Sequence, residues 1–536
     1  MKTHILQRWP AMLCLAAGFL AVSCTNLSET PYDQVTTANF HPTAQDMASL
    51  IAPAYTPLRA MWMQWYGALD LLEETGDEFL TPVRPNGWYD GGIYIQQHKH
   101  RWTPYNGQES NLWNQSFAVI NSANRVIFQI DSGVVPTDAA TKTAIVSELR
   151  AVRAYAYYML LDNFGNVPIV TDFKQKDLPQ QSTRQQVYDF VVKELTDVIP
   201  NLPDATGQAM YGRMNKWAAL ALLARVYLNA EVYTGTPAYD KVIPVTQQII
   251  DAGRYQLDAD YRMPFSRNNQ NSREIIFAVP YDAVNGRCSQ FHMKTLKPDL
   301  EYVFNLQAQP WGGSASNPQF IATYDTADVR LKDTWLMGPQ FDGQGRGYNF
   351  TAYVPRIDST GFNNGFPVWK YEIYAGETGC SDVDYPVIRY AEVLMMQAEA
   401  LLRLGNADAA AALVTQVRQR DFPTDPAKAT VTGAELQQGS VYNYGWYDTD
   451  GVVKTGPGGT PVTNGGADVK YGRFLDELGW EFAIEGHTRT DMIRFGVYTT
   501  KSWFNHAPDN NPDRRLFAIP QGAINTNSNL KQNPGY

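Results

Sequence analysis

The sequence predicts a mainly α-helical protein: a solenoid of tetratricopeptide-like helix pairs with a large irregular, loop-rich insertion that contains short strands. Three observations support this fold class. Residues 143–170 have a long helical pattern, similar alanine-rich patterns recur at residues 215–233 and 385–420, and residues 260–382 lack any helical period. Helix pairs that repeat along a chain stack on one another, because no single pair can bury its apolar face alone.

The helix predicted within residues 143–170 has the clearest pattern. Its first half places five apolar residues at steps of three and four, namely Ile145, Leu149, Val152, Ala156 and Met159. This spacing gives one apolar face of an α-helix. Residues 154–161 are apolar or aromatic almost all round, so this half must lie between neighbouring helices. Gly165 predicts the C-terminal end, and Pro168 prevents the helix from resuming.

All three patterns interleave alanines with large apolar residues, and each is followed by a second helical segment. The second helices are predicted at residues 184–199, 238–252 and 407–420. Small residues on a helix face allow a neighbouring helix to approach closely, which favours stacked pairs. The pair at residues 385–420, with Gly405 at its turn, is the nearest match to a tetratricopeptide repeat.

The N-terminus has the pattern of an export signal. Lys2 and Arg8 give a positive start, residues 9–22 form an apolar core, and the small residue Ser23 precedes Cys24. This apolar run is too short for a permanent membrane span, so a removable signal is predicted.

A cysteine directly after the cleavage point resembles the lipobox of bacterial lipoproteins, although Ala21 occupies the usual leucine position. We therefore predict a signal peptide at residues 1–23, lipidation of Cys24 and a polar tether at residues 24–42. Ordinary secretion is the alternative. If the protein is membrane-bound, we expect a lipid anchor rather than a spanning helix.

Charge argues against nucleic acid as a partner. The formal net charge is −10, and it becomes −12 without residues 1–23, which carry Lys2 and Arg8 and no acidic residue. Phosphate binding needs a basic face, which an acidic chain of this kind does not predict.

Cysteine usage leaves one pairing open. Cys14 is lost with the signal and Cys24 is lipidated, so Cys288 and Cys380 remain. They form either one disulfide in an oxidising compartment or two buried thiols.

Residues 76–107 differ from their helical surroundings because they are rich in turn-forming and aromatic residues. The rings are Trp88, Tyr89, Tyr94, Trp102 and Tyr105. Sugars stack their C–H faces on aromatic rings, and their hydroxyls bond to side chains such as Asp77 and Arg84. For any single ring, plugging the end of the helical stack is the commoner role. Trp88 has glycines on both sides, so we expect it to be exposed.

Residues 260–382 contain glycine, asparagine and aromatic residues, with short strands predicted at residues 274–279, 351–356 and 367–371. Trp311 lies on a glycine-flanked turn of this region. A long insertion without a period, placed between helix pairs, usually carries function. A second glycine-rich stretch at residues 445–466 predicts a flexible excursion or a small flap.

No catalytic motif is present, and we predict that the protein is not an enzyme. A glycosidase needs two carboxylates that straddle the scissile bond. The acidic pairs available are Glu73 with Glu74, Asp77 with Glu78, and Glu481 with Glu485. The last pair is spaced i and i+4, which is typical of a solvated or salt-bridged helix face. No nucleophile elbow, Walker loop or dinucleotide fingerprint occurs.

No cofactor or metal is predicted. His98 and His100 flank Lys99, without a nearby carboxylate or a third ligand at helical spacing, which is a poor pattern for zinc. A structural calcium ion is compatible with such a chain, but no motif supports one.

Five segments resemble successive signatures of the SusD/RagB family. They are LRAVRAYAYYMLLDNFGNVPIV, NKWAALALLARVYLNA, YPVIRYAEVLMMQAEALLRLG, LDELGWEFAIEGHTRTDMIRFG and the terminal LFAIPQGAINTNSNLKQNPGY. Their order is that of the family, and a lipobox precedes them. Leu478 and Gly479 stand where the family often has two arginines, and His487 takes a common glutamine position. None of these departures falls on an expected ligand site.

The resemblance implies a cell-surface lipoprotein of the outer membrane, of the Bacteroidetes type. Such a protein captures oligosaccharides and passes them to a SusC-like TonB-dependent transporter. It implies an N-terminal helical region at residues 43–259, an irregular ligand-site region at residues 260–382 and a C-terminal region at residues 383–536. The helical half would face the transporter, and a shallow aromatic site would belong to the irregular half.

The resemblance also implies site residues by position. The expected glycan contacts are Trp88 and Trp311 for stacking, Asp77, Arg84 and Asp70 for polar contacts, and His292 and Cys288 in the segment GRCSQFHMK. Two alternatives stay open: a peptide-capturing lipoprotein like RagB, and a tetratricopeptide-type assembly scaffold without its own ligand. The sequence does not identify the glycan.

Overall fold

The computed structural model describes residues 43–85, 89–445, 447–448, 452–453 and 465–536. The predicted signal peptide, the lipidation site Cys24, the tether and Trp88 lie outside these residues. Among the residues that are described, no helix combines the length and the apolar character needed to cross a membrane.

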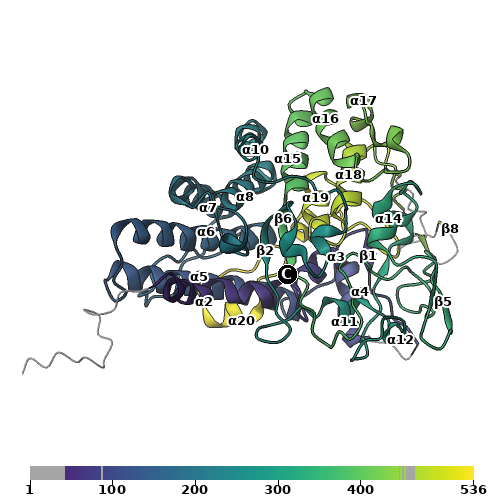
Figure 1. Cartoon of the computed structure of the whole chain (residues 1–536), viewed down its shortest axis with the longest axis horizontal. Helices are drawn as coiled ribbons and strands as arrows, with labels where there is room; N and C mark the ends of the chain where they lie inside the picture. Colours follow the sequence, from purple (N-terminus) through teal and green to yellow (C-terminus); the bar gives the residue numbers. More distant parts are fainter. Residues whose placement is uncertain (1–42, 86–88, 446, 449–451, 454–464) are drawn as a thin grey trace, which may run out of the picture.

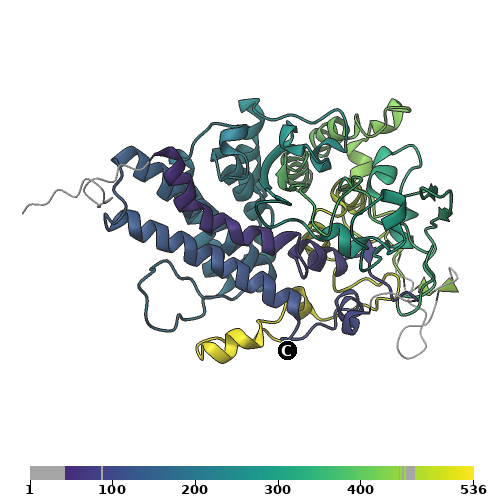
Figure 2. The same cartoon turned by 60° about the horizontal axis from the view of Figure 1, so that its bottom comes forward.

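The helical half consists of long helices that pack in succession (Figure 1). They are α2 (Ala44–Trp62), α5 (Gly107–Asp131), α6 (Ala139–Asn163), α7 (Arg184–Val198), α8 (Lys216–Leu228), α10 (Tyr239–Ala252), α15 (Tyr390–Arg403) and α16 (Ala407–Arg418). From α5 to α8 each of these helices packs on the next, and α8, α10, α15 and α16 continue the series. α2 covers α5, and Figure 2 shows these two helices side by side. The mainly α fold of stacked helix pairs is therefore confirmed.

The local sequence explains where these helices begin and end. Thr43 and Asp46 form a capping box at the start of α2, and Thr183 and Gln186 form another at α7. Such caps satisfy N–H groups that the first helical turn leaves unpaired. Gly405, with φ of 89°, makes the predicted turn between α15 and α16.

The central helix of the stack is α6. Asp138 caps its start by accepting hydrogen bonds from the N–H groups of Ala140 and Thr141. The helix ends at Asn163, and Gly165 follows with φ of 71°. Every residue from 151 to 163 is buried, because α5 and α7 both pack against this helix. The predicted burial between neighbouring helices is confirmed.

The strands are short and pair two by two, all antiparallel. The longest pair, β2 (Ile275–Val279) with β6 (Tyr385–Arg389), is fully buried and joins the start of the irregular region to the strand that leads into α15. The other pairs are β1 (Phe79–Leu80) with β3 (Ala315–Ser316), β4 (Pro339–Phe341) with β5 (Gly347–Asn349), and β7 (Tyr447–Asp448) with β8 (Val452–Val453).

One of the three predicted strands is confirmed, and two are wrong. Residues 274–279 contain β2, but residues 351–356 and 367–371 contribute only isolated bridges, Thr351 with Asn364 and Val368 with Trp335. A strand needs a ladder of consecutive pairs, and at both places the neighbouring chain turns away after a single pair.

Short helices and 3₁₀ turns are distributed along the rest of the described chain, between irregular segments. The short helices are α3 (Ala68–Glu74), α4 (Ile93–His98), α9 (Ala230–Thr234), α11 (Phe291–Thr295), α12 (Leu300–Phe304), α13 (Pro318–Ile321), α14 (Val329–Thr334), α17 (Gly433–Leu436), α18 (Gly472–Phe482), α19 (Thr488–Arg494) and α20 (Gln521–Thr526). The 3₁₀ turns are Asp90–Gly92, Ile199–Asn201, Gln208–Met210, Met263–Phe265, Asn269–Asn271, Pro426–Ala429 and Pro512–Arg515.

A buried ionic cluster holds the C-terminal region to β6. The guanidinium of Arg389 lies 2.7 Å from Glu481 and 2.6 Å from Glu485. Burial alone would raise the pKa of Glu481, but Arg420, Arg389 and Arg330 hold it at about 2. Of the two roles expected for this acidic spacing, the structure shows the salt-bridged one. The expected shared helix face is wrong, because α18 contains Glu481 but ends at Phe482, before Glu485, and both side chains are buried.

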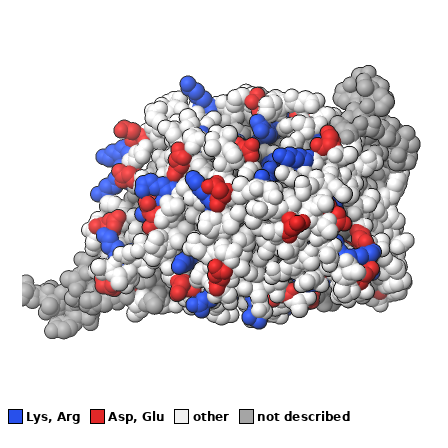
Figure 3. All heavy atoms as spheres, turned by 90° about the horizontal axis from the view of Figure 1, so that it is seen from above, with Lys and Arg blue, Asp and Glu red and all other residues white. Residues whose placement is uncertain are grey.

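The surface charges are mixed. On the face seen in Figure 3, basic and acidic side chains are interspersed, and no continuous basic area covers it. This face therefore lacks the clustered cations that a phosphate backbone requires.

Candidate functional site

Two tryptophans from distant parts of the chain form an aromatic pair. Trp65 follows the C-terminal end of α2, and Trp311 precedes β3; their ring centroids are 4.9 Å apart and their planes are tilted by 43°. Trp65 is 40% exposed, and Trp311 is partly buried. Flat apolar faces at a surface are the chemical feature that sugar rings and aromatic ligands stack on.

The Trp65 turn rests on the segment that follows Cys288. The side-chain amide of Gln64 donates a hydrogen bond to the carbonyl oxygen of Cys288. The backbone N–H of Gln290 donates in turn to the carbonyl oxygen of Met63 at 2.7 Å. Trp65 therefore sits on a turn that is fixed to the irregular region as well as to α2.

A disulfide between Cys288 and Cys380 anchors this segment. Next to it, Ser289 and Ser381 exchange two backbone hydrogen bonds of 2.9 Å. Of the two states left open by the sequence, the structure shows the disulfide. Cys288 is buried, so it supports the aromatic pair rather than facing a ligand.

Backbone hydrogen bonds fix the Trp311 turn to residues 293–294. The N–H of Trp311 donates to the carbonyl oxygen of Met293 at 2.7 Å, and the N–H of Gly313 donates to that of Lys294 at 3.2 Å. Gly313 has φ of 136°, and a Cβ there would lie 2.7 Å from Arg84. The turn therefore requires glycine at this position, both for its backbone angle and for space.

The predicted polar contacts Asp70 and Arg84 lie beneath these turns and not on the surface. Arg84 is 5% exposed and donates to the carbonyl oxygens of Gly313, Gly361 and Asn364 at 2.9, 2.7 and 3.0 Å. Burial lowers the pKa of Arg84 to about 9. Asp70 is buried and forms an ion pair with Lys294. Burial raises its pKa, and Lys294 opposes that rise.

Asp77 is also buried, 5% exposed, and its Oδ2 accepts a hydrogen bond of 3.0 Å from the Tyr444 hydroxyl. Burial raises the pKa of Asp77 to about 7. The expectation that Asp77 and Arg84 are exposed in this loop is therefore wrong, because the protein itself encloses both side chains. A ligand would have to displace protein contacts to reach them.

His292 supports the same region. It is 8% exposed, and its Nε2 lies 3.0 Å from the carbonyl oxygen of Thr378, next to the disulfide. Burial lowers the pKa of His292 to about 4, so it is a neutral donor to that carbonyl. It lies close to the aromatic pair in sequence and in structure, but its contacts are internal.

Other exposed rings come from the predicted aromatic loop. Tyr89 is 56% exposed and Tyr105 is 78% exposed, whereas Trp102 and Tyr94 are buried. Trp88 lies outside the described residues, so its expected exposure stays a prediction. Sequence reasoning did not single out Trp65, because it falls at the end of a helical pattern; its position two residues before Gly67 was the available signal.

None of the three acidic pairs is arranged for hydrolysis at this surface. Glu73, Glu74 and Glu78 are at most 4% exposed, and burial raises the pKa of each of them. Glu73 accepts a hydrogen bond from the N–H of Gly486 at 2.6 Å, and Glu74 accepts one from the N–H of Thr81 at 2.6 Å. These carboxyl groups face the protein interior.

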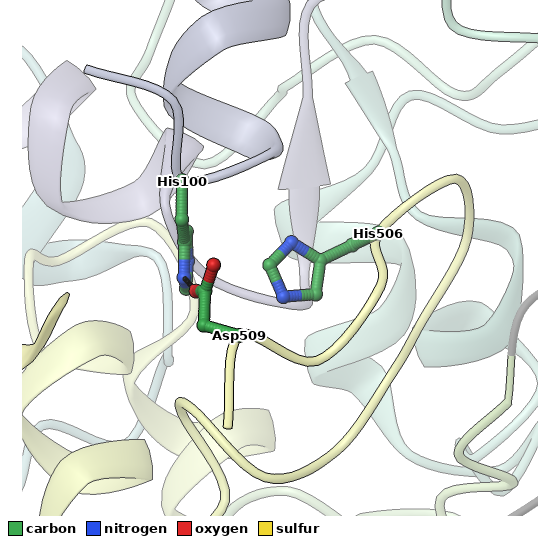
Figure 4. Close-up of side chains that lie close together, drawn as sticks. All are labelled: His100, His506 and Asp509. Carbon is green, nitrogen blue, oxygen red and sulfur yellow. Dashed lines mark hydrogen bonds and ion pairs between the residues drawn. The ribbon is translucent and has the colours of Figure 1, made fainter. Parts of the chain in front are cut away.

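The fold changes the interpretation of His98 and His100. Their sequence neighbourhood offers no carboxylate or third ligand, but the C-terminal region supplies both (Figure 4). Asp509 Oδ2 lies 2.7 Å from His100 Nδ1, and the ring of His506 lies 4.3 Å from that of His100. These residues form a buried histidine cluster, separate from the aromatic pair.

Curated proteins are similar to this chain over most of its length. Among curated relatives, the starch-binding protein SusD of Bacteroides thetaiotaomicron is 26% identical over 463 residues, 76% of each chain. SusD-like protein P25 of Formosa agariphila is 22% identical over 508 residues, 89% of each chain.

Solved structures share the fold. A SusD superfamily protein from Parabacteroides distasonis superposes with a TM-score of 0.70 at 19% identity, covering 94% of this chain and 100% of that one. Surface glycan-binding protein A from Bacteroides thetaiotaomicron, in complex with laminarihexaose, gives 0.68 at 18% identity, covering 92% and 100%.

Two family models match in sequence order. The first, described as "Starch-binding associating with outer membrane", matches residues 27–228, and the second, described as "SusD family", matches residues 246–536. The second match alone covers more than half of the chain. The chain belongs to the SusD family.

Proposed function

We propose that this protein is a cell-surface lipoprotein that captures oligosaccharides on the surface formed by Trp65 and Trp311. The observation that carries the proposal is the meeting of these two rings, 4.9 Å apart, on two turns that the disulfide segment and Arg84 hold in place. A rigid pair of rings binds a sugar without first paying for the ordering of a loop, which favours affinity.

The tilt of the two rings favours a curved oligosaccharide over a flat one. Rings inclined by 43° present a shallow angle, which matches successive sugar units that rotate along an oligosaccharide. Aromatic stacking accepts any sugar with an apolar C–H face, and hydroxyl contacts then select among them. Trp88 belongs to this proposal as a third ring.

The relatives suggest glucans as the first ligands to test. One curated relative is named a starch-binding protein, and one structural neighbour was solved with laminarihexaose. We propose binding without hydrolysis, because the three acidic pairs available for a glycosidase are enclosed by protein.

We further propose that the lipid on Cys24 anchors the protein at the outer membrane and that a SusC-like TonB-dependent transporter takes up the captured glycan. The family description, "associating with outer membrane", supports the location. Co-purification from native membranes in mild detergent tests the partnership. Isolation of the protein without any enriched TonB-dependent barrel would argue for a scaffold or a free receptor instead.

Affinity electrophoresis of the mature chain against starch, laminarin and a panel of other polysaccharides tests the ligand. We expect retardation by at least one glycan, and its loss in the double variant Trp65→Ala/Trp311→Ala. Phe173→Ala is the matched control, since Phe173 is 47% exposed and lies between α6 and α7 in the helical half. Retention of a peptide mixture, with no glycan retarded, would favour the peptide-capturing alternative.

A further inference from the structure

Three of the seven histidines of the chain, His98, His100 and His506, gather in one buried place beside Asp509. His98 ends α4 and His100 follows it, whereas His506 and Asp509 lie in the loop after α19. Figure 4 shows His100 and His506 on either side of the Asp509 carboxylate. The side chain of His100 is fully buried, and that of Asp509 is 4% exposed.

The hydrogen bonds of His506 determine where its lone pair lies. Its Nδ1 is 2.8 Å from the carbonyl oxygen of His98, so Nδ1 carries the proton and donates it. Its Nε2 is then an acceptor, and this buried atom has no hydrogen-bond partner. A buried acceptor without a partner is costly, and such atoms in proteins usually mark an unseen water or ion.

His100 differs from His506, because hydrogen-bond acceptors face both of its ring nitrogens. Nε2 is 2.9 Å from the carbonyl oxygen of Thr75, and Nδ1 is 2.7 Å from Asp509 Oδ2. A neutral imidazole carries a single N–H. If that N–H donates to Thr75, the lone pair on Nδ1 faces the carboxylate oxygen. A second proton on His100 would satisfy Asp509, but His506 Nε2 would remain without a partner.

A single cation among these atoms satisfies all three groups. We propose that His100 Nδ1, His506 Nε2 and Asp509 bind a divalent transition-metal ion, with Zn²⁺ the ion that fits best. Two imidazoles and one carboxylate are a donor set that suits zinc far better than calcium. Each imidazole already donates its other N–H to a backbone carbonyl, which is the usual arrangement behind a metal-bound histidine.

The three ligand atoms would have to approach one another only slightly to bind one ion. The three ligand atoms lie within 4.8 Å of one another. Bonds to Zn²⁺ are about 2.0–2.2 Å long, so two ligands of one ion lie at most about 4.2–4.4 Å apart. Asp509 is the ligand that moves, because residues 507–509 are partly exposed whereas both histidines are enclosed. Its carboxylate turns from His100 toward the ion, and a water completes four-coordination.

The basic residue next to the cluster, Arg101, does not prevent the binding of a divalent cation. Arg101 lies 3.3 Å from Asp509 Oδ1, but its side chain is 61% exposed and can move into solvent once the ion neutralises the carboxylate. The ion would tie the segment after α4, which ends in the buried Trp102, to the loop around His506. The role we assign to it is structural, and it is independent of what the aromatic pair binds.

The test uses the mature chain after removal of any affinity tag and of metal by a chelator. Zinc content after dialysis, calorimetric titration with Zn²⁺ and the melting temperature with and without Zn²⁺ are measured. We expect one equivalent of Zn²⁺ per chain and a higher melting temperature with zinc. His506→Gln and Asp509→Asn should each weaken binding by about 100-fold or more, beyond the effect of losing a second-shell partner.

His292→Gln is the matched control, because His292 is also buried, also faces a backbone carbonyl and also has an unpartnered Nδ1. It should leave zinc binding unchanged. Equal loss in the control and in the cluster variants would overturn the proposal, as would absence of stoichiometric binding by the wild type. Should the variants fail to fold, anomalous diffraction at the zinc edge from wild-type crystals decides: a peak between His100 and His506 supports the site, and a water there overturns it.

Discussion

The ring of Trp311 lies 4.9 Å from the ring of Trp65, yet the two residues differ in how much of each ring reaches solvent. Trp65 is 40% exposed, whereas Trp311 is partly buried and its backbone is bonded to Met293. The pair therefore joins a ring with a larger exposed surface to a ring that is more enclosed by the protein. Substitutions should separate these roles.

Trp65→Ala should weaken glycan binding about tenfold or more, since stacking on an aromatic ring contributes about 1–3 kcal/mol and 1.4 kcal/mol is a factor of ten. Its unfolding free energy should fall by only about 1 kcal/mol or less. Trp311→Ala should weaken binding similarly and should also destabilise the fold. The loss of unfolding free energy should be smaller than the loss for truncation of a core tryptophan, which is about 3–5 kcal/mol. Calorimetric titration and urea unfolding of both variants measure this. Wild-type affinity in Trp65→Ala would show that the ligand surface lies elsewhere.

Trp88→Ala should also weaken glycan binding about tenfold or more while leaving the melting temperature nearly unchanged, because the residue is expected in an exposed loop. The next residue, Tyr89, is 56% exposed. Tyr105→Ala is the control, since Tyr105 is a 78% exposed ring of the same 76–107 stretch. Normal affinity together with a collapsed melting temperature would mean that Trp88 packs the protein.

Removal of the disulfide should reduce both stability and binding. The bond joins residues separated by 92 positions, and loss of such a link typically costs about 2–5 kcal/mol. Gln64 bonds to the carbonyl of Cys288, so a looser segment should also displace Trp65. Urea unfolding of Cys288→Ser/Cys380→Ser should match that of reductant-treated wild type. A reductant that fails to shift the wild-type transition would contradict this prediction.

Stability should depend on the ionisation of Asp77. Burial raises its pKa to about 7, from 3.8 for an ordinary aspartate. The contribution of protonated Asp77 to stability is fully present below pH 3.8. It is lost as the pH rises from there through about 7, because the unfolded chain ionises first. Asp77→Asn can still accept the Tyr444 hydrogen bond and cannot ionise. Relative to wild type, it should therefore gain stability from about pH 4 to about pH 7 and keep that gain unchanged at higher pH.

Melting curves across that range measure the gain. Asp325→Asn is the control, since Lys428 and nearby donors lower the pKa of Asp325, and this group stays ionised throughout. A constant difference between Asp77→Asn and wild type at all pH values would contradict the assignment.

Cys24→Ala should move the protein from the outer-membrane fraction to a soluble one, because a lipid on this residue is the expected anchor. Cys14→Ala, inside the predicted signal, should leave the location unchanged. Detergent-phase partitioning of both variants measures the effect. Unchanged partitioning of Cys24→Ala would argue for a different attachment.

The helix pairs could be predicted because their signals are local. The apolar spacing of α6, its stop signal Gly165 and the turn at Gly405 all lie within a few positions of the feature that they specify. The family resemblance grouped Trp311 with the segment containing Cys288 and His292, and the structure brings the Trp311 turn onto Met293 of that segment; the ligand contacts of these residues stay a prediction.

The rest depends on contacts between distant residues. Asp77 and Arg84 stand among turn formers, which favours exposure, but Tyr444 and the carbonyls of residues 313–364 enclose them. Trp65 has a helical neighbourhood, and its contact with Trp311 becomes visible only in the fold. The cluster of His100 with His506 joins residues that no spacing pattern could connect.

The pairing of β2 with β6 closes the chain on itself at both ends of residues 280–384, which include Trp311, His292 and both disulfide cysteines. The long helices before and after this segment therefore meet one another through a strand pair that lies outside it. Buried residues of the segment, such as Arg330 and Lys370, also pair with the C-terminal region, so changes there would disturb the helical frame. Its surface turns, such as the one that carries Trp311, can change length and ring content without touching those contacts, and the fold can thus acquire new ligand preferences there.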